Sequence, residues 1–287
     1  MFHQAKRGGI PSLLVNARMS EKSAKGYARL GSLMKQTLAD ISHICAQTEP
    51  SAERFINLGL DKNKVSIPGN IKFDTDMPAH LREQAEAIRR DWFQQRPSWI
   101  AASTHEGEDE RVLAAFSKIK NKYPNSLLVL VPRHPERFND VAKLAEKKGY
   151  SVTRRSEQKS AKITSDIFLL DTLGELKLYY ATVDVAFVGG SLVPTGGHNM
   201  LEPAALSVPV LFGQHVHNFS EISEELLLKK AAIQVMDESH LAAEVIDLLA
   251  SPVKRDNMGA AGCEFVQQNQ GAVEKVAKRI ASLLNEC

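Results

Sequence analysis

The sequence predicts an α/β fold with parallel sheets, and three observations lead to that prediction. Short apolar, β-branched runs such as residues 185–188 are typical of strands that helices cover on both faces. From residue 77 onward these runs alternate with stretches of helical length, as βαβ units with right-handed crossovers do. Polar residues gather directly after the strands, at the edge where open α/β sheets bind ligands.

The first segment, residues 1–76, has the elements of an incomplete domain. Its elements are expected, in order, as the end of a helix and a turn at 1–11, a strand at 12–16, a helix at 20–39, a strand at 41–46, a helix at 51–58 and a strand at 65–68. Three strands are few for a doubly wound sheet, which usually has about five or more. We therefore expect this segment to be the C-terminal part of a larger N-terminal domain whose beginning lies outside this sequence.

Residues 77–268 carry the regular alternation and form a second predicted domain, and residues 269–287 form a C-terminal helix. The predicted strands cover residues 99–102, 127–131, 151–153, 167–170, 184–188, 208–212 and 232–235. The predicted helices cover residues 77–92, 108–122, 135–148, 173–181, 199–206, 218–230, 238–250, 253–268 and 271–285. The polar stretch at 154–162 is expected to be a loop.

Composition excludes several classes of protein. With 43% hydrophobic and 24% charged residues, the chain has the make-up of a soluble globular protein. The net charge of +2 is too mild to indicate a nucleic-acid partner. The three cysteines form no metal or redox motif, which fits a reducing compartment. No apolar run approaches the roughly 18 residues that a membrane span needs.

The stretch 185–221 concentrates the glycine signals. Gly189, Gly190 and Ser191 interrupt a predicted strand, and Gly196 and Gly197 precede a predicted helix start. Glycine is favoured where the backbone takes a positive φ or comes close to a ligand. The free N–H groups of a helix start can hold an anion, so a phosphate or carboxylate is expected near this turn.

The helix start itself allows two interpretations. If Asn199 is the N-cap, Glu202 completes a capping box, but Pro203 then loses a backbone hydrogen bond inside the helix. If Pro203 is the first helical residue, Glu202 is the cap and its carboxylate is freer to face a ligand. Glu202 is thus either only a cap or an acceptor of hydrogen bonds from sugar hydroxyls.

Polar residues follow four predicted strands, and these residues are expected to line one cleft. Arg133 is the strongest candidate, because a guanidinium at this edge suits bidentate contact with a phosphate or carboxylate. The candidates with a polar ring or hydroxyl are Ser103, Thr104, His105, His134, Ser191 and His198. The histidines can donate to anions or only orient loops, and the hydroxyls can contact a ligand or only cap helices.

Two further features carry weaker predictions. His215 and His217 alternate in a loop without an evident third ligand, so no metal site is expected. Arg18 follows a predicted strand end and is a candidate for the cleft. The glycine patterns of P-loop NTPases and of the hydrolase elbow are absent from the sequence.

Five motifs, in matching order along essentially the whole chain, then indicate a family. They are LLVNARMSEKSAKGY (13–27), GNIKFD (69–74), ASTHEGED (102–109), LVPRHPERF (130–138) and FVGGSLVPTGGHNMLEPA (187–204). Together they closely resemble the 3-deoxy-D-manno-octulosonic acid (Kdo) transferases of Gram-negative lipopolysaccharide synthesis. The resemblance implies a GT-B glycosyltransferase with two Rossmann-like domains, of which the C-terminal one holds the nucleotide sugar.

The resemblance also implies the reaction and its partners. The donor would be CMP-Kdo and the acceptor lipid IVA, with inversion at the transferred sugar, no cofactor, and a peripheral location at the cytoplasmic face of the inner membrane. It assigns Arg133 and His134 to donor binding, and Asn199 and Glu202 to nucleotide or sugar contacts. Gly189, Gly190 and Ser191 would form the loop around the CMP phosphate.

One departure from the family pattern concerns the general base. The family's base glutamate lies in an early glycine-containing turn of the N-terminal domain, and no stretch of this sequence matches it. No catalytic residue is therefore assigned, and we expect this chain alone to be inactive or badly impaired. The alternatives are a non-catalytic CMP-sugar-binding fragment and another GT-B enzyme, such as a different nucleotide-sugar transferase or a sugar-nucleotide epimerase.

Overall fold

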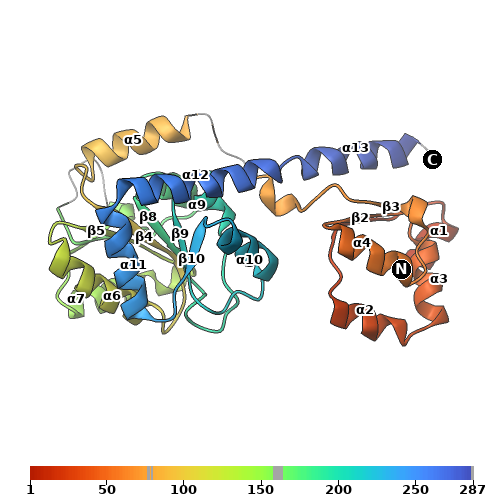
Figure 1. The fold of residues 1–287 in the computed structure, drawn as a ribbon, viewed down its shortest axis with the longest axis horizontal. Helices are drawn as coiled ribbons and strands as arrows, with labels where there is room; N and C mark the ends of the chain where they lie inside the picture. The colour runs from red at the N-terminus through yellow and green to blue at the C-terminus, as the bar shows by residue number, and fades with distance from the viewer. Residues whose placement is uncertain (76–77, 79, 158–163, 286–287) are drawn as a thin grey trace. The chain divides into compact units, whose positions relative to one another are not determined.

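The computed structural model describes residues 1–75, 78, 80–157 and 164–285, and its chain forms two compact units (Figure 1). The first unit comprises Met1–Thr75 and Gln267–Cys287, and the second comprises Asp76–Val266. Both contain parallel sheets between helices, as the alternation of elements predicts. In the part of the chain that is described, no helix has both the length and the apolar character needed to cross a membrane.

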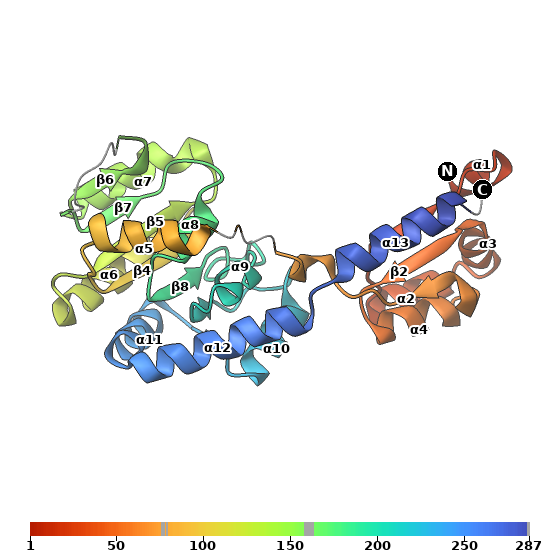
Figure 2. The same cartoon turned by 90° about the horizontal axis from the view of Figure 1, so that it is seen from above.

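A three-stranded parallel sheet in the order β1-β2-β3 forms the centre of the first unit. Its strands are β1 (Leu13–Ala17), β2 (His43–Ala46) and β3 (Val65–Ser66). Its helices are α1 (Phe2–Arg7), α2 (Glu21–Ala28), α3 (Ser32–Asp40), α4 (Glu49–Asn57) and α13 (Ala272–Asn285) (Figure 2). The core of this unit is built from apolar residues of β1, β2, α3 and α4, among them Ile44, Leu38 and Phe55.

The single helix expected over residues 20–39 is two helices, α2 and α3. Gly31 stands between them with φ of 50°, a backbone conformation that glycine adopts without the Cβ penalty of other residues. Ser20 does cap the first of these helices, because its side chain accepts a hydrogen bond from the Ser23 N–H. The prediction that this segment is helical is therefore confirmed, whereas the prediction of one continuous helix is wrong.

The last helix, α13, groups with the first unit rather than standing alone. Asp74 accepts hydrogen bonds at its two carboxylate oxygens from the backbone N–H groups of Gly271 and Val273, each 2.5 Å long. A carboxylate at a helix start satisfies N–H groups that have no partner within the helix. Asp74 follows the short 3-10 turn η2 (Ile71–Phe73), so a residue early in the chain caps its final helix.

The second unit contains a seven-stranded, all-parallel sheet in the order β10-β9-β8-β4-β5-β7-β6. Its strands are β4 (Ser98–Thr104), β5 (Leu127–Pro132), β6 (Val152–Arg154), β7 (Ile167–Leu169), β8 (Val185–Val188), β9 (Val210–Phe212) and β10 (Ala232–Gln234). Its helices are α5 (Leu81–Asp91), α6 (Asp109–Lys122), α7 (Phe138–Lys147), α8 (Leu176–Tyr180), α9 (Leu201–Ala205), α10 (Ser220–Leu228), α11 (Glu238–Ala250) and α12 (Pro252–Gln268).

Every strand and helix predicted between residues 77 and 268 is present, with its ends shifted by a few residues. Two of these predictions fall partly outside the described residues. They are the start of the helix at 77–92, which the structure shows from Leu81, and most of the loop at 154–162.

Alternate residues of the central strands enter two separate cores. Trp99 and Phe187 point to the face covered by α6, α7 and α11, whereas Ile100 and Ala186 point to the face covered by α5 and α8. Figure 1 shows α5 on one side of this sheet and α6 and α7 on the other. Both faces are buried, which explains why the strands are nearly continuous apolar runs.

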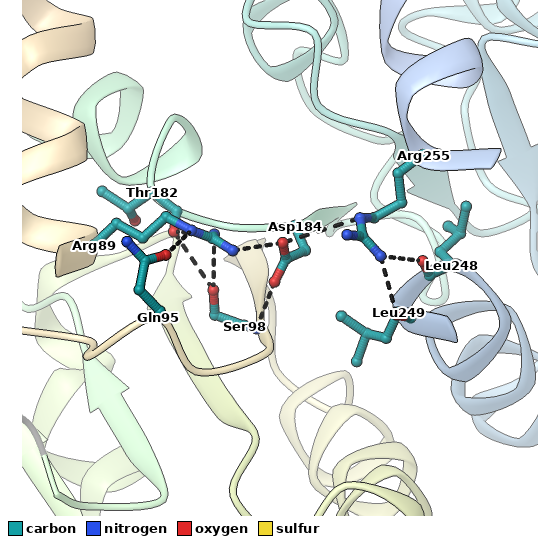
Figure 3. Close-up of polar contacts among 8 residues, drawn as sticks. All are labelled: Arg89, Gln95, Ser98, Thr182, Asp184, Leu248, Leu249 and Arg255. Carbon is teal, nitrogen blue, oxygen red and sulfur yellow. Dashed lines mark hydrogen bonds and ion pairs between the residues drawn. The ribbon is translucent and has the colours of Figure 1, made fainter. Parts of the chain in front are cut away.

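A polar network joins the amino ends of β4 and β8 to the surrounding helices (Figure 3). Asp184, just before β8, accepts from the Ser98 N–H at 2.9 Å and from the Arg89 guanidinium of α5 at 2.7 Å. Arg89 also donates to the Thr182 carbonyl, and Arg255 of α12 lies 4.0 Å from the Asp184 carboxylate. We call this the amino-edge network; one carboxylate in it connects two strands and two helices.

Candidate functional site

The carboxyl ends of β5, β4, β8 and β9 lie side by side at one edge of the sheet. The chain passes from β4 to β5 on one side, while β8 flanks β4 on the other side, so the β4–β8 boundary is the topological switch point. Open α/β sheets bind ligands at this position. The polar residues that follow these four strands in sequence therefore share one edge, as predicted.

Three histidines from three different loops meet there. His105 follows β4, His134 follows β5 and His198 follows β8. The Nε2 atoms of His105 and His198 are 2.7 Å apart, and their rings stack with centroids 5.0 Å apart. The His134 ring meets His105 edge-on at 5.3 Å. A nitrogen–nitrogen contact this short requires one ring to donate and the other to accept, so at least one ring is neutral.

The surroundings of these histidines oppose their protonation. Burial, followed by the nearby His105, Arg133 and His134, lowers the pKa of His198 to about 4. Burial likewise lowers the pKa of His105, with further contributions from His134, Arg137 and Arg133. Both rings are therefore neutral at neutral pH. The permanent positive charge of this edge comes from arginine.

Arg133 provides such a charge. Its backbone N–H donates to the Thr104 carbonyl, which holds the loop after β5 against the end of β4. The Arg133 side chain is exposed, and among the described residues its guanidinium has no hydrogen bond or ion pair. An unpaired guanidinium beside neutral imidazoles is suited to bidentate binding of a phosphate or carboxylate.

The glycine turn after β8 is built around Glu108, which is fully buried. One carboxylate oxygen accepts from the N–H groups of Gly190 (2.7 Å) and His105 (3.2 Å). The other accepts from the N–H groups of Ser191 (3.1 Å) and Leu192 (2.9 Å). The N–H groups of Gly190 and Ser191, expected from the sequence to surround a phosphate, thus point to an internal carboxylate.

The first two glycines of this turn have steric reasons to be glycine. A Cβ on Gly189 would lie 2.7 Å from a Glu108 carboxylate oxygen and 2.8 Å from the Ser103 carbonyl oxygen. Gly190 has φ of 65°, and a Cβ there would lie 2.9 Å from the His198 ring. The turn is therefore packed tightly between Glu108 and His198.

The predicted hydroxyl donors have mostly internal partners. The Ser191 hydroxyl donates to the Val188 carbonyl at 2.6 Å and accepts from the Gly213 N–H at 2.8 Å, and the residue is fully buried. The Thr104 hydroxyl donates to Asp109 at 2.6 Å and is also buried. Ser103 has φ of 57° at the point where the β4–β5 register shifts, as in a β-bulge. The hydroxyls of Ser191 and Thr104 therefore bind neighbouring groups of the same unit. Neither residue is a helix cap.

A second buried carboxylate, that of Asp109, supports the loop after β5. Besides the Thr104 hydroxyl, it binds the guanidinium of Arg137, which also donates to the Thr104 carbonyl at 2.8 Å. Burial raises the pKa of Asp109, while Thr104 and Arg137 lower it. Glu108 and Asp109 are consecutive, and each supports a different loop of the edge.

The start of α9 follows neither of the two expected arrangements. The helix begins at Leu201 with Met200 as N-cap, and the Asn199 side-chain oxygen accepts from the Leu201 N–H at 3.1 Å. Glu202 is therefore the second helical residue, and Pro203 stands in the first turn, where its missing N–H is tolerated. The Asn199 amide donates to Glu202 at 3.3 Å. Burial raises the pKa of Glu202, and Lys177 and Asn199 lower it.

Two further residues singled out in the sequence belong to other segments of the chain. His217 packs against Gly196, where an added Cβ would lie 2.5 Å from the imidazole. Among residues 1–75, 78, 80–157 and 164–285, no three His, Cys, Asp or Glu side chains are grouped to hold a metal ion. Arg18 is exposed after β1 in the first unit.

Sequence reasoning missed Glu108, Asp109 and Arg137. An acidic pair at the start of a predicted helix has an ordinary explanation, the favourable interaction with the helix dipole. Three of the four N–H groups that Glu108 accepts from lie 82 to 84 residues further along the chain, which no local pattern indicates. The one available signal was the presence of two carboxylates beside a predicted ligand edge.

Comparison with known proteins identifies relatives of the whole chain. The family model described as 3-deoxy-D-manno-octulosonic-acid transferase (kdotransferase) matches residues 1–75. The chain is 41% identical over 277 residues to the 3-deoxy-D-manno-octulosonic acid transferase of Haemophilus influenzae and 33% identical over 278 residues to that of Bordetella pertussis. These alignments cover 96% and 94% of this chain but only 65% and 63% of the two relatives.

Solved structures give a consistent result. The C-terminal CMP-Kdo binding domain of WaaA from Acinetobacter baumannii is 33% identical to this chain, with a TM-score of 0.61. The alignment covers 66% of this chain and 98% of that domain. The UDP-GlcNAc 2-epimerase from Neisseria meningitidis is 14% identical, with a TM-score of 0.57, and aligns with 100% of this chain and 72% of its own. At that identity the epimerase shares the fold alone.

Proposed function

Because this chain belongs to the Kdo transferase family, we propose that it serves in the transfer of Kdo from CMP-Kdo to lipid IVA. The observation that carries the proposal is the match of 66% of this chain to nearly the full length of a domain named for binding CMP-Kdo. The exposed guanidinium of Arg133 and the three histidines at the carboxyl edge of the second unit support it, since the donor is anionic. In this proposal, the second unit holds the donor.

The donor phosphate lies against Arg133 and His134. The guanidinium of Arg133 offers two parallel N–H donors, and it keeps its charge at any physiological pH. Because His105 and His198 are held neutral and one ring donates its N–H to the other, the pair offers one further N–H donor without adding fixed charge. A bound phosphate would favour the protonated form of these rings and so raise their pKa values.

The nucleotide and sugar hydroxyls lie against Asn199 and Glu202. The Glu202 carboxylate accepts from the Asn199 amide and can accept hydroxyl donors with its remaining lone pairs. Gly189, Gly190 and Ser191 shape the wall of the phosphate site by their compact backbone. Their contribution is close approach rather than donated hydrogen bonds, since the N–H groups of Gly190 and Ser191 are directed to Glu108.

The reaction inverts the anomeric centre of Kdo. Such a transfer needs a base that takes the proton of the acceptor hydroxyl and fixed positive charge that stabilises the departing CMP phosphate. Arg133 supplies the second requirement. We assign the first to no residue of this chain. Since the acceptor is a lipid of the inner membrane, we place the reaction at its cytoplasmic face, where the protein makes peripheral contact.

The test is a transfer assay with CMP-Kdo generated in place and lipid IVA as acceptor. It is run for this chain and for a version extended by an N-terminal segment from a relative. Transfer by the extended form alone supports the proposal and locates the base in the added segment. Transfer by neither form, together with no binding of CMP to this chain, contradicts it.

Nucleotide binding separates the alternatives. Calorimetric titration with CMP and with UMP compares the two bases on the same phosphate and ribose. A preference for UMP would indicate another GT-B nucleotide-sugar enzyme. Binding of CMP without transfer by the extended form, even at saturating acceptor, would indicate a non-catalytic CMP-binding protein.

A further inference from the structure

The Gly190–Leu192 turn is an anion nest that already contains its anion. Three consecutive N–H groups converge on the Glu108 carboxylate at 2.7 to 3.1 Å. Converging backbone N–H groups of this kind bind phosphates and other anions in many proteins. Here the occupant is a side chain of the same unit, buried behind the turn.

The same carboxylate is connected to both members of the His105–His198 pair, directly to one and through the turn to the other. It accepts from the His105 N–H directly. It reaches His198 through the turn, because the His198 ring packs on Gly190 and the Gly190 carbonyl accepts from the Gly197 N–H at 2.8 Å. The two histidines are far apart in sequence, and Glu108 is the group that both of their backbones are linked to.

We propose that Glu108 is a positioning residue for the donor site, which holds His105 and His198 at hydrogen-bonding distance and keeps the glycine turn closed behind them. This inference rests on the proposed function for its consequence on donor binding. The positions that Glu108 gives to His105 and His198 do not depend on which ligand binds. Glu108 touches neither donor nor acceptor in this scheme, so it acts only through the loops.

A glutamine at this position is the informative substitution. Glu108→Gln keeps the length of the side chain, but its NH2 group faces two N–H donors and cannot accept from them. The turn must then move, and with it the contact of His198 with His105. Loss of the negative charge by itself would lower the pKa of nearby histidines, whereas separation and exposure of the two rings would raise it. The direction of the change therefore distinguishes geometry from charge.

The experiment is a nuclear magnetic resonance titration of the histidine rings in the full chain. Wild-type His198 is expected to titrate near its lowered pKa of about 4. In the Glu108→Gln variant we expect its midpoint to rise toward the ordinary value near 6.5, by about one unit or more. CMP binding, measured in parallel, is expected to weaken about tenfold, since a misplaced site loses its alignment.

Asp184→Asn is the matched control. It also replaces a hydrogen-bonded carboxylate adjoining β4 and β8, but at the opposite end of the strands. It should lower the melting temperature while leaving the His198 midpoint unchanged. If Glu108→Gln does not fold, Gly190→Ala perturbs the same turn from its other side, because its Cβ would meet the His198 ring.

The outcomes separate this inference from the proposed function. An unchanged or lowered His198 midpoint in a folded Glu108→Gln or Gly190→Ala protein overturns the positioning role. A raised midpoint in a protein whose wild-type form does not bind CMP supports the positioning role and contradicts the proposed donor. A raised midpoint with weakened CMP binding supports both.

Discussion

Each end of the strands of the seven-stranded sheet has a hydrogen-bonded carboxylate, Asp184 at the amino edge and Glu108 at the carboxyl edge, and the two are satisfied in different ways. At the amino edge, Asp184 faces the guanidinium groups of Arg89 and Arg255. At the carboxyl edge, Glu108 accepts from four backbone N–H groups, while the guanidinium of Arg133 is exposed and unpaired within the described residues. The cations beside Asp184 are thus neutralised inside the fold, whereas at the carboxyl edge Arg137 is paired with Asp109 and Arg133 is left available to a ligand.

This difference teaches where stability and binding reside. When an arginine and a carboxylate of the same fold pair with each other, they hold structural elements together but leave no charge free to bind a ligand. A carboxylate satisfied by N–H groups fixes a loop and leaves the neighbouring cation free for an external anion. Substitutions at the amino edge should therefore change stability alone, and exposed cations at the carboxyl edge should change binding alone.

The largest effect is expected for Asp184→Ala, which removes the centre of the amino-edge network. The Arg89 guanidinium and the Ser98 N–H lose their partner, so we expect a loss of about 2 to 4 kcal/mol in the free energy of unfolding. Urea denaturation measures it. Asp91→Ala, which breaks the exposed Arg90–Asp91 pair, is the control and should leave the free energy of unfolding close to that of wild type. Equal losses in both variants would contradict the special position of Asp184.

The second effect concerns binding. Arg133→Ala should weaken CMP affinity by about 10- to 100-fold, because a charge-assisted hydrogen bond to the phosphate is lost. Its unfolding free energy should stay within about 0.5 kcal/mol of wild type, since the side chain has no internal partner among the described residues to lose. Isothermal titration gives the first quantity and denaturation the second. Arg82→Ala, an exposed arginine of α5, should leave CMP binding unchanged.

A third, smaller effect depends on pH. The pKa of His198 is lowered in the folded protein to about 4, below the value near 6.5 of an unfolded chain. The unfolded state therefore binds more protons between these values, and stability contributed by the neutral ring is lost as the pH falls from about 6.5 to 4. Because the ring is partly exposed, we expect His198→Gln to reduce this loss by only about 1 kcal/mol. An identical stability profile for variant and wild type over this range would refute it.

The smallest effect is expected for Glu202→Gln. The substitution keeps the side chain's size and a carbonyl oxygen for Asn199, but weakens hydrogen bonds to ribose or sugar hydroxyls. CMP affinity should fall about threefold, as for one ordinary hydrogen bond, while affinity for inorganic phosphate stays the same. A parallel loss for both ligands would place Glu202 near the phosphate instead.

The sheet of the second unit could be predicted because its strands are buried on both faces, so that runs such as Val185–Val188 are apolar throughout. The break at Gly31 could not, since an isolated glycine within a helical pattern is often tolerated. At α9 the competing caps were both plausible locally, and the structure uses Met200 instead. Here the tertiary packing of a five-residue helix decides its start.

The sequence predicts at which strand ends the site residues lie, but not how they contact one another. Arg133, His105 and His198 could be placed on one edge because parallel strands end together. Their mutual distances could not, since they depend on Glu108 and on backbone groups more than 80 residues away. The internal partners of Ser191 could not be predicted, because a hydroxyl has the same appearance in sequence whether its partner is a ligand or a neighbouring carbonyl.

The cap that Asp74 places on α13 has a consequence for biosynthesis. The chain leaves the first unit after Thr75 and returns to it at Gln267, so the second unit is an uninterrupted insertion in the first. A ribosome therefore completes the second unit before it has made the helix that Asp74 caps. The inserted unit can fold during translation, whereas the first unit must wait for the last segment to emerge before it acquires that helix.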